Sequence, residues 1–533
     1  MPPRAELQDP PLSKVIAPPK PLSLAEVRLC IALLEAIIED RALMADVPAP
    51  ERQALMLAAG RVSRPARHEA TRLVKEFRRR RKRSEQDHDR RTRNTAGIRS
   101  ARLAPVFVAP APARIAAAAA DGAEADVPTL KKPKSCYVCK TDFTRLHFFY
   151  DALCPECAAF NYEKRFQSAP LDGRVAVITG ARVKIGFHTA LKVLRAGGEV
   201  IATTRFPHDA AQRYARESDF AEWKDRLQIH GLDLRHSPSV EIFTRYLERS
   251  LGRLDILVNN ACQTVRRPPG FYSHLLDFEA RAVSDLPADL QPLLRSHQSC
   301  VSVLSGAQAL PHREAADATG LDVWHAGGSG VGLVSSAALS QVSYAYDDAT
   351  RRVDLFPEGA LDVDLQQVDL RARNTWRLTL AEVATPEMLE VHLINAVAPF
   401  ILCSKLKPLM MRERTGDKHI VNVSAMEGIF SRGTKTDRHP HTNMAKAALN
   451  MMTLTSARDY VRDGIHMNAV DTGWVTDEDP AMHATRKRDE LDFQPPLDIV
   501  DGAARICDPF FSGLLTGVHV WGRFLKDYKP SAW

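Results

Sequence analysis

The segment RVAVITGARVKIG, from Arg174 to Gly186, decides the fold of this 533-residue chain. Its first half is a short apolar run of the kind that forms a buried strand, and its second half is a turn that leads into a helix. When Gly180 follows a strand in this way, backbone N–H groups and the N-terminus of the next helix can face a phosphate group. The segment therefore predicts the first strand–turn–helix unit of an α/β domain, with a phosphate site at the turn.

Short apolar runs and amphipathic helices continue to alternate from Leu171 onward, which is typical of a parallel sheet covered by helices on both faces. We therefore predict the fold class α/β, with a doubly wound parallel sheet of about seven strands. The predicted strands are RVAVITG (174–180), GEVIATT (198–204), LQIHGLD (227–233), LDILVNN (254–260), KHIVNVS (418–424), IHMNAV (465–470) and GVHVWG (517–522).

A long insertion, residues 263–385, interrupts this pattern between the fourth and fifth predicted strands. It leaves the sheet at the carboxyl end of a strand, where open α/β sheets bind ligands, so it can cover an active-site cleft. Its central part, GGSGVGLVSSAALSQVSYAYDD (327–348), is glycine-rich and then β-like. We interpret it as a lid or small subdomain.

Five motifs in this order resemble the short-chain dehydrogenase/reductase superfamily: TGARVKIG (179–186), Arg205, GLDL (231–234), NNA (259–261) and TGWVT (472–476). The resemblance covers roughly residues 171–522 and implies a Rossmann-like domain, 169–533, that binds a dinucleotide. In the superfamily turn TG-x-x-x-G-I-G, the middle glycine falls at Lys184 of this chain. The cofactor contacts implied by the resemblance are Thr179, Gly180, Arg182, Lys184, Ile185, Gly186, Arg205, Asp233, Leu234, Asn260, Ala261, Lys446, Thr472 and Gly473.

The end of the second strand indicates which cofactor is preferred. An acidic residue there would bond the ribose hydroxyls of NAD and repel a 2′-phosphate, but this strand ends in Thr-Thr-Arg. Arg205, with Arg182 or Lys184, can pair with the 2′-phosphate, which favours NADP and leaves NAD as the alternative. A solvated surface arginine is the other interpretation of Arg205.

The resemblance implies an active site of Asn, Ser, Tyr and Lys. INAVAPF (394–400) places the Asn at Asn395, and HPHTNMAKAALN (439–450) places the Lys at Lys446. NVSAMEG (422–428) puts Ala425 at the Ser position, preceded by Ser424, and Thr442 stands at the Tyr position. Thr442 cannot replace a tyrosine as a neutral-pH acid or base, because an aliphatic hydroxyl is much less acidic than a phenol.

Other groups could supply the proton. His441 or His439 titrates near neutrality, and we take Asn395, Lys446, Thr442 and His441 as the catalytic candidates. Tyrosines of the insertion, Tyr272, Tyr344 and Tyr346, are alternatives. Arg266 and Arg267 follow NNAC and could bind an anionic substrate.

Two Cys-x-x-Cys pairs, Cys136 with Cys139 and Cys154 with Cys157, lie fourteen residues apart in a predicted ribbon domain, 134–168. Four thiolates complete the tetrahedron that a structural Zn²⁺ prefers, so we predict a zinc site that stabilises folding. Redox-active pairs or disulfides are the alternatives. His147 could replace one cysteine, although we expect it to pack or hydrogen-bond in the loop.

The N-terminal region, 1–91, is predicted to be helical, because Ser23 and Glu26 form a capping-box pattern before an apolar helix and two more helices follow. Residues 72–102 carry a local excess of nine positive charges, so the rest of the chain sums to −2 of the net +7. No aromatic residues are interleaved in the run of six basic residues, 78–83, so we favour a solvated helix end over a nucleic-acid site, which stays open as the alternative. The Ala/Pro-rich segment 92–133 is predicted to be a linker without a fixed path.

The chain has 45% apolar and 26% charged residues, which is typical of globular proteins. It lacks an eighteen-residue apolar run and a secretory leader, so we expect a cytoplasmic protein without a membrane segment, and a homo-oligomer is compatible with the sequence. The sequence is compatible with two functions. The first is an NADP-dependent oxidoreductase of a small-molecule substrate, with a non-standard proton-transfer site. The second is a catalytically inactive dinucleotide-binding pseudoenzyme that serves as a regulatory or interaction module.

Overall fold

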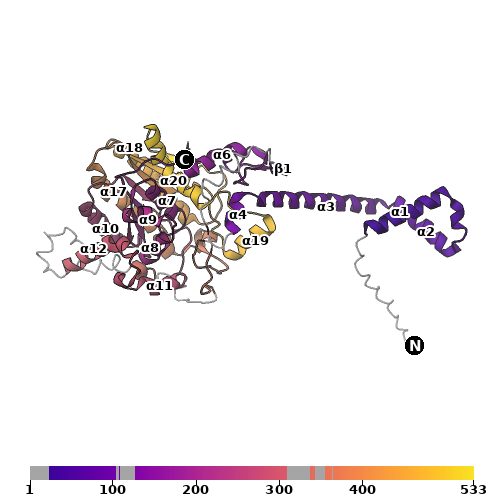
Figure 1. Cartoon of the computed structure of the whole chain (residues 1–533), viewed down its shortest axis with the longest axis horizontal. Coiled ribbons are helices and arrows are strands. Elements are labelled where there is room, and N and C mark those ends of the chain that lie inside the picture. The colour runs from indigo at the N-terminus through magenta and orange to yellow at the C-terminus, as the bar shows by residue number, and fades with distance from the viewer. Residues whose placement is uncertain are drawn as a thin grey trace, which may run out of the picture. The chain divides into compact units, whose positions relative to one another are not determined.

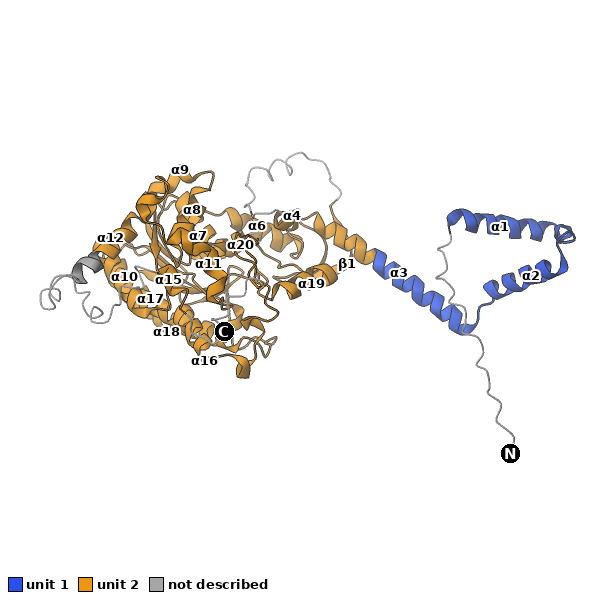
Figure 2. Ribbon diagram, turned by 90° about the horizontal axis from the view of Figure 1, so that it is seen from below, with its two compact units in different colours: residues 1–84 blue, residues 85–533 orange. Residues whose placement is uncertain are grey.

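The computed structural model describes residues 23–103, 107, 127–308, 336–342, 355–362 and 364–532. The chain divides into two compact units, residues 1–84 and residues 85–533 (Figure 2). Helix α3 (Arg67–Asn94) begins in the first unit and ends in the second.

The first unit contains helices α1 (Leu24–Glu39) and α2 (Ala49–Ser63), the 3-10 turn η1 (Arg41–Met44) and the first part of α3. The predicted capping box begins α1. The Ser23 hydroxyl accepts a bond from the Glu26 N–H at 3.2 Å, and the Glu26 carboxylate accepts one from the Ser23 N–H at 2.8 Å. The prediction of three N-terminal helices is confirmed.

The second unit is built around an eight-stranded sheet with the order β10-β9-β8-β7-β6-β3-β4-β5. Neighbouring strands from β5 to β9 are parallel, and β10 pairs antiparallel with β9. The order reverses between β3 and β6, the switch point at which Rossmann-like sheets bind ligands. The strands are β3 (Val175–Thr179), β4 (Glu199–Thr204), β5 (Leu227–Gly231), β6 (Ile256–Asn259), β7 (Lys418–Ser424), β8 (Ile465–Asp471), β9 (Phe524–Lys526) and β10 (Lys529–Ser531).

Helices cover both faces of this sheet; α7 packs with α20, and α10 packs with α17 (Figure 1). Val177 and Ile178 are neighbours on β3 but belong to different apolar cores, since side-chain direction alternates along a strand. The helices of these layers are α7 (Lys184–Arg195), α8 (Pro207–Ala215), α9 (Phe220–Trp223), α10 (Ser237–Ser250), α16 (Thr385–His392), α17 (Ala398–Met411), α18 (Pro440–Val461) and α20 (Ile499–Thr516), whereas α19 (Ala481–Leu491) has no buried residue.

The predicted seventh strand, GVHVWG, is wrong. Residues 517–522 form an irregular connection, and the strand comes later, at β9. Gly517 ends α20 with a φ of 70°, and Asn468 of β8 donates its side-chain amide to the Val520 carbonyl at 2.6 Å. The connection therefore runs beside β8 through side-chain bonds, although its alternating apolar residues are typical of a strand.

The insertion is mostly helical where it is described. Its elements are η3 (Pro269–Tyr272), α11 (Ser273–Glu279), η4 (Val283–Asp285), α12 (Gln291–Gln308), α15 (Ser336–Leu339), η7 (Thr375–Arg377) and η8 (Leu380–Glu382). Helix α12 packs against the edge strand β5 and so covers a row of unpaired backbone groups. The β-like interpretation of the central part is wrong for residues 336–342, which form the short helix Ser336–Leu339 and a turn; residues 327–335 and 343–348 lie outside the described part of the chain.

The apolar segment Thr385–Met411, comprising α16, the π-helical turn η9 (Leu393–Val397) and α17, has the length and hydropathy of a membrane span. Half of its most apolar window is buried inside the protein. Leu402, Leu406 and Leu409 belong to the core between the sheet and α10, which explains the apolar composition without a membrane.

The Cys-rich segment forms a hairpin, β1 (Thr129–Ser135) and β2 (Asp142–Arg145), followed by helix α6 (Pro155–Phe166). The Arg165 guanidinium on α6 is buried and lies 2.6 Å from Asp498 and 2.9 Å from Asp501 at the start of α20. The Tyr150 hydroxyl donates to Asp501 at 2.5 Å. The ribbon is thus joined to the sheet domain through ionised groups withdrawn from water.

The predicted linker is shorter than expected, because α3 continues to Asn94 and α4 (Gly97–Leu103) follows it. Arg99 of α4 is buried and pairs with Asp151 at 2.7 Å and with Asp492 at 2.6 Å. The other end of the predicted linker is also wrong, because strand β1 begins at Thr129; residues 104–106 and 108–126 lie outside the described part of the chain.

Candidate functional site

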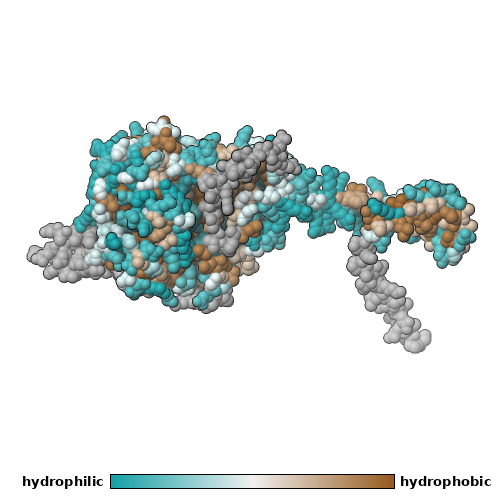
Figure 3. Space-filling view, viewed as in Figure 1, coloured by the Kyte–Doolittle hydropathy of each residue, from teal (hydrophilic) through white to brown (hydrophobic). Residues whose placement is uncertain are grey.

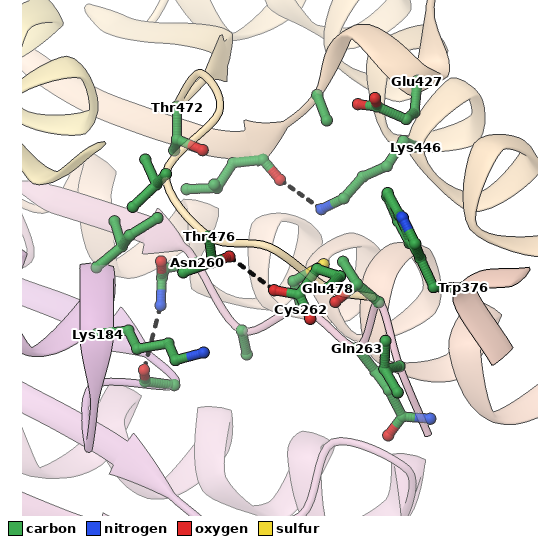
Figure 4. Close-up of a pocket in the computed structure, with 18 of the residues that line it drawn as sticks. Lys184, Asn260, Cys262, Gln263, Trp376, Glu427, Lys446, Thr472, Thr476 and Glu478 are labelled. Carbon is green, nitrogen blue, oxygen red and sulfur yellow. Dashed lines mark hydrogen bonds between the residues drawn. The ribbon is translucent and has the colours of Figure 1, made fainter. Parts of the chain in front are cut away.

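A cavity of about 1140 Å³ opens at the carboxyl ends of the parallel strands (Figure 4). Its walls come from the turn after β3, the ends of β4 to β8, the insertion, helix α18 and the loop after β8. This volume exceeds that of most small-ligand pockets, so a dinucleotide and a second molecule can be accommodated together.

Gly180 and Gly186 shape the floor of this cavity. Gly180 has a φ of 66°, and a Cβ atom there would lie 2.8 Å from the Cα of Ala261. A Cβ at Gly186 would lie 2.3 Å from the side-chain nitrogen of Asn260 and 2.4 Å from the Gly180 carbonyl oxygen. Both positions require glycine, and the missing side chains leave backbone groups and the start of α7 open to a ligand.

All of the predicted cofactor contacts except Thr179 line the cavity. Thr179 is buried below it, where its hydroxyl accepts a bond from the Ala261 N–H at 3.0 Å. Asn260 donates to the carbonyls of Thr179 and Gly180 at 2.9 and 3.2 Å. Thr179 and Asn260 therefore hold the Gly180 turn against the end of β6.

Arg205 lies in the cavity wall at the end of β4 and contacts Tyr272, as donor to the hydroxyl at 2.6 Å and at 4.5 Å from the ring centre. Within the described residues no carboxylate lies within ion-pair distance of Arg205. Arg182, in contrast, pairs with Asp209 at 2.6 Å. Of the two arginines, Arg205 is the one whose charge is open to an incoming anion.

Lys184 adopts a left-handed φ of 54° at the position where the superfamily turn has glycine. This conformation costs a lysine roughly 1–2 kcal/mol. Burial lowers the pKa of its ammonium, but Glu478 and Asp364 outweigh this effect and raise the pKa overall. In Figure 4, Glu478, held by the Thr476 hydroxyl at 2.7 Å, lies across the cavity from Lys184. The lysine thus faces carboxylates at the place where we expected it to bind phosphate.

Lys446 extends from α18 into the cavity and donates to the Val423 carbonyl at 2.7 Å (Figure 4). His439 and Asn443 lie on the same face of α18, since residues 3, 4 and 7 positions apart share a helix face, and both line the cavity. The His439 ring stacks on Trp376 at 3.8 Å, and its Nδ1 lies 3.1 Å from the Asn443 side-chain oxygen. An amide oxygen can only accept, so this contact requires a proton on Nδ1.

Two predicted catalytic residues, His441 and Thr442, do not line the cavity. Both are 2% exposed, and neither the Thr442 hydroxyl nor the His441 ring has a hydrogen-bond partner among the residues that the structure describes. His441 Nε2 lies 3.6 Å from Glu387. Ala425 lines the cavity, whereas the hydroxyl of Ser424 is buried without a partner.

Asn395, the remaining catalytic candidate, lies in the π-helical turn η9, below the cavity wall. Its side chain accepts from the Gln263 N–H at 2.9 Å and donates to the Gln263 carbonyl at 3.1 Å. Single π-helical turns frequently occur at functional sites. Here the turn brings Asn395 to the residue that begins the insertion, so its direct effect is to fix the insertion at the cavity edge.

The two arginines expected to bind an anionic substrate have carboxylate partners. Arg266 is buried and pairs with Glu390 at 3.0 Å, and Arg267 lines the cavity but pairs with Asp369. Of the alternative tyrosines, Tyr272 lies beside Arg205, while Tyr344 and Tyr346 lie outside the described residues.

The Cys-rich ribbon contributes two residues to the cavity wall, Tyr137 and Lys140. The Tyr137 hydroxyl accepts a hydrogen bond from the Trp474 N–H at 3.0 Å, directly after Gly473. Lys526 of β9 lies 5.3 Å from the Tyr137 ring centre. Sequence reasoning missed this contact, because nothing in the spacing of the cysteines indicates where the ribbon docks.

The sulfur atoms of Cys136, Cys139, Cys154 and Cys157 all lie within 4.8 Å of one another. Four thiols at this separation could hold a metal ion. His147 is outside this group and packs against Phe148, Tyr150 and Tyr162. Tyr137 lies between the first two cysteines, so the cluster and the cavity share one loop.

Asp471 ends β8 beside Ser424 of β7 and lines the cavity. Burial raises the pKa of its carboxyl to about 6, and Glu427 and Asp527 add to the effect while Lys526 opposes it. A carboxyl of this pKa exchanges protons near neutral pH. The sequence signal was the charge itself, directly after the predicted strand 465–470.

Comparison with known proteins matches residues 174–279 to the family model "short chain dehydrogenase" and residues 369–494 to "Enoyl-(Acyl carrier protein) reductase". "Uncharacterized protein R665" of Acanthamoeba polyphaga mimivirus is 30% identical over 389 residues, 71% of each protein. "Carbonyl reductase (NADPH) 1" of Oryctolagus cuniculus is 28% identical over 142 residues, 26% of this chain and 50% of that one. NADPH-bound carbonyl reductase from chicken fatty liver superposes with a TM-score of 0.39 and 16% identity, over 68% of this chain and 100% of that chain.

The two matched segments lie on either side of the central part of the insertion and include the Gly180 turn, helix α18 and the loop after β8. They contain most of the residues that line the cavity, and they include the switch point of the sheet. The chain therefore belongs to the short-chain dehydrogenase/reductase family, whose members are typically NAD(P)-dependent oxidoreductases.

Proposed function

We propose that this protein is an NADP-dependent oxidoreductase whose proton-transfer group is a histidine in place of the family tyrosine. One observation carries the proposal: a single cavity joins the glycine turn that suits a pyrophosphate to the helix face that presents Lys446 and His439. NADP(H), when bound, supplies or accepts the hydride.

The residues around Gly180 fit such a cofactor. Backbone N–H groups and the start of α7 would receive the pyrophosphate, and Arg205 would receive the 2′-phosphate. The preference for NADP rests on Arg205 alone, because Arg182 is already neutralised by Asp209.

The preference can be tested by calorimetric titration of NADPH and NADH into the wild type and Arg205→Ala. Loss of one charge-assisted contact should weaken NADPH binding by roughly 10- to 100-fold and leave NADH unchanged. Arg216→Ala, an exposed arginine on the same side of the sheet, is the matched control. Equal losses for the two nucleotides would show that Arg205 does not contact the 2′-phosphate.

His439 is suited to move the proton. Burial lowers the pKa of its imidazole below 6.5, so the ring is neutral at physiological pH and its Nε2 can accept a proton from an alcohol. Stacking on Trp376 and the bond to Asn443 fix the ring, and Lys446 supplies a positive charge on the same helix face.

Turnover of a panel of alcohols and carbonyls, followed by NADPH absorbance, tests this role. His439→Gln should reduce kcat by roughly a hundredfold or more without weakening NADPH binding, and Lys446→Ala should also reduce it. His483→Gln, outside the cavity, should keep full activity. An active His439→Gln enzyme would rule out the histidine.

We also propose that the four clustered cysteines hold a structural Zn²⁺. Four thiolates leave no coordination position for a substrate, so the ion would stabilise the loop that carries Tyr137. Metal analysis of purified protein should give one zinc per chain; a metal-free protein of unchanged stability would refute the assignment.

The pseudoenzyme remains the second candidate, and a specific observation favours it. Ala425 stands where the family resemblance places the catalytic serine, and the nearby hydroxyls of Ser424 and Thr442 are buried without partners. The protein would then bind NADP without turnover. Absence of activity on the whole panel, with intact NADPH affinity, would establish it.

A further inference from the structure

The first unit has no core of its own. In residues 23–84, all of which are described, every side chain is exposed or half-exposed and none is buried. Large apolar residues are nevertheless exposed on all three helices. Those on α1 and α2 form the brown surface of this unit in Figure 3. The exposed apolar residues of the three helices include Leu24, Val27, Leu29, Ile31, Leu33, Ile38, Met56, Leu57, Val62, Leu73, Val74 and Phe77. Apolar surface on this scale needs a partner.

The spacing on α1 indicates that the partner is a helix. Leu24, Val27, Ile31, Leu34 and Ile38 are separated by alternating steps of three and four residues, the seam of a coiled coil. Leu29 and Leu33 lie off this seam and are 73% and 53% exposed. A helix that is apolar on more than one side fits a bundle, where several helices surround it.

Charge indicates which helices would pair. Helix α1 carries Glu26, Glu35 and Glu39 against a single Arg28. The part of α3 within the first unit is strongly basic, with six consecutive cations at 78–83. A second copy of this chain offers both the matching apolar seam and the opposite charge, so an acidic α1 can lie along a basic α3 of another copy.

We propose that residues 23–84 form a self-association module that buries its apolar seam against the same region of another copy of this chain. An anionic membrane is the less suitable partner, because the acidic residues of α1 lie beside the apolar seam. A nucleic acid would pair with 78–83 but would leave the apolar residues exposed.

The full-length protein tests this by sedimentation or light scattering at micromolar concentration. The wild type should have a mass at least twice that of the 59.2 kDa chain. Ile31→Asp/Ile38→Asp should lower that mass, whereas Leu515→Asp, an equally exposed residue at the end of α20, should not. Glu35→Lys/Glu39→Lys should also lower the mass, because it removes the opposite charge and leaves the apolar seam unchanged.

A monomeric wild type would overturn the proposal, and so would a seam variant of unchanged mass. Thermal unfolding of the second unit should be the same in the wild type and the seam variant, which shows that the loss is confined to association. A monomer that co-sediments with phosphatidylserine vesicles, or that binds single-stranded RNA, would assign the apolar helices or the basic stretch to that partner instead.

Discussion

The Arg165→Ala variant tests whether the Cys-rich ribbon is part of the folded core. The guanidinium is 1% exposed and lies 2.6 Å from Asp498 and 2.9 Å from Asp501, which are themselves almost fully buried. It also lies over the Phe149 ring, 4.4 Å from its centre. Truncation would leave two carboxylates facing each other in the interior without their direct ion-pair partner, and only the more distant charges of Arg102 and Arg505 would remain.

Breaking a buried ion pair by removing one partner typically costs about 3–5 kcal/mol, because the remaining charge stays desolvated. We expect Arg165→Ala to lose stability in this range. Arg195→Ala is the matched control: Arg195 also pairs with two carboxylates, Glu217 and Asp219, but is 41% exposed. Exposed pairs contribute about 0–1 kcal/mol, so the control should be close to the wild type.

Equilibrium urea unfolding, followed by tryptophan fluorescence, measures both variants. A loss for Arg165→Ala no larger than that for Arg195→Ala would refute the view that ribbon and sheet domain share one core. A separate early transition, assigned to the ribbon by cysteine labelling, would refute it equally.

Three further predictions follow from the cavity wall. Asp471→Asn should be more stable than the wild type, by up to about 3 kcal/mol, because the folded pKa of about 6 lies above the usual 3.8 and ionisation therefore opposes folding. The difference should grow between about pH 4 and pH 6 and stay constant above; a pH-independent difference in unfolding free energy would contradict it. Tyr137→Phe should remove the hydrogen bond that protects the Trp474 N–H, so this amide should exchange faster and the free energy of unfolding should fall by about 1 kcal/mol, while exchange in the distant β5 should not change. Unchanged exchange at Trp474 would show that the bond is absent in solution. Removal of metal by a chelator should lower the melting temperature of the whole second unit, and unaltered melting would exclude a structural ion.

The sheet was largely predictable because its strands are continuous apolar runs between glycine turns. Six of the seven predicted strands are present, and only the last was misplaced. GVHVWG alternates like a strand, but its partners are the side chain of Asn468 and the backbone at Met467, which no local pattern indicates. A strand needs a neighbour in register, and that information is not local.

The face of α18 that lines the cavity was predictable only in part. Lys446 shares a helix face with residues three or four positions earlier, so Asn443 and Thr442 were equally acceptable from spacing alone. In the structure Asn443 lines the cavity with Lys446, and Thr442 does not. His439, which precedes the first residue of the helix, also lines the cavity, and His441 does not.

Long-range contacts were beyond sequence reasoning. Arg182 and Lys184 were expected to bind phosphate as free cations, yet Asp209 lies beside the first and Asp364 near the second. The docking of Tyr137 on the loop after β8 is of the same kind. Each depends on how separate segments pack, which residue type and spacing do not determine.

Hydrogen exchange with and without saturating NADPH tests most directly whether glycine turn, ribbon and β8 loop enclose one nucleotide site. Peptides covering 179–186 and 472–476, and the ribbon loop 136–140, should exchange more slowly in the presence of NADPH, while those of β5 should be unaffected. Unchanged exchange at 179–186, or protection confined to segments outside the cavity, would contradict a dinucleotide at the Gly180 turn.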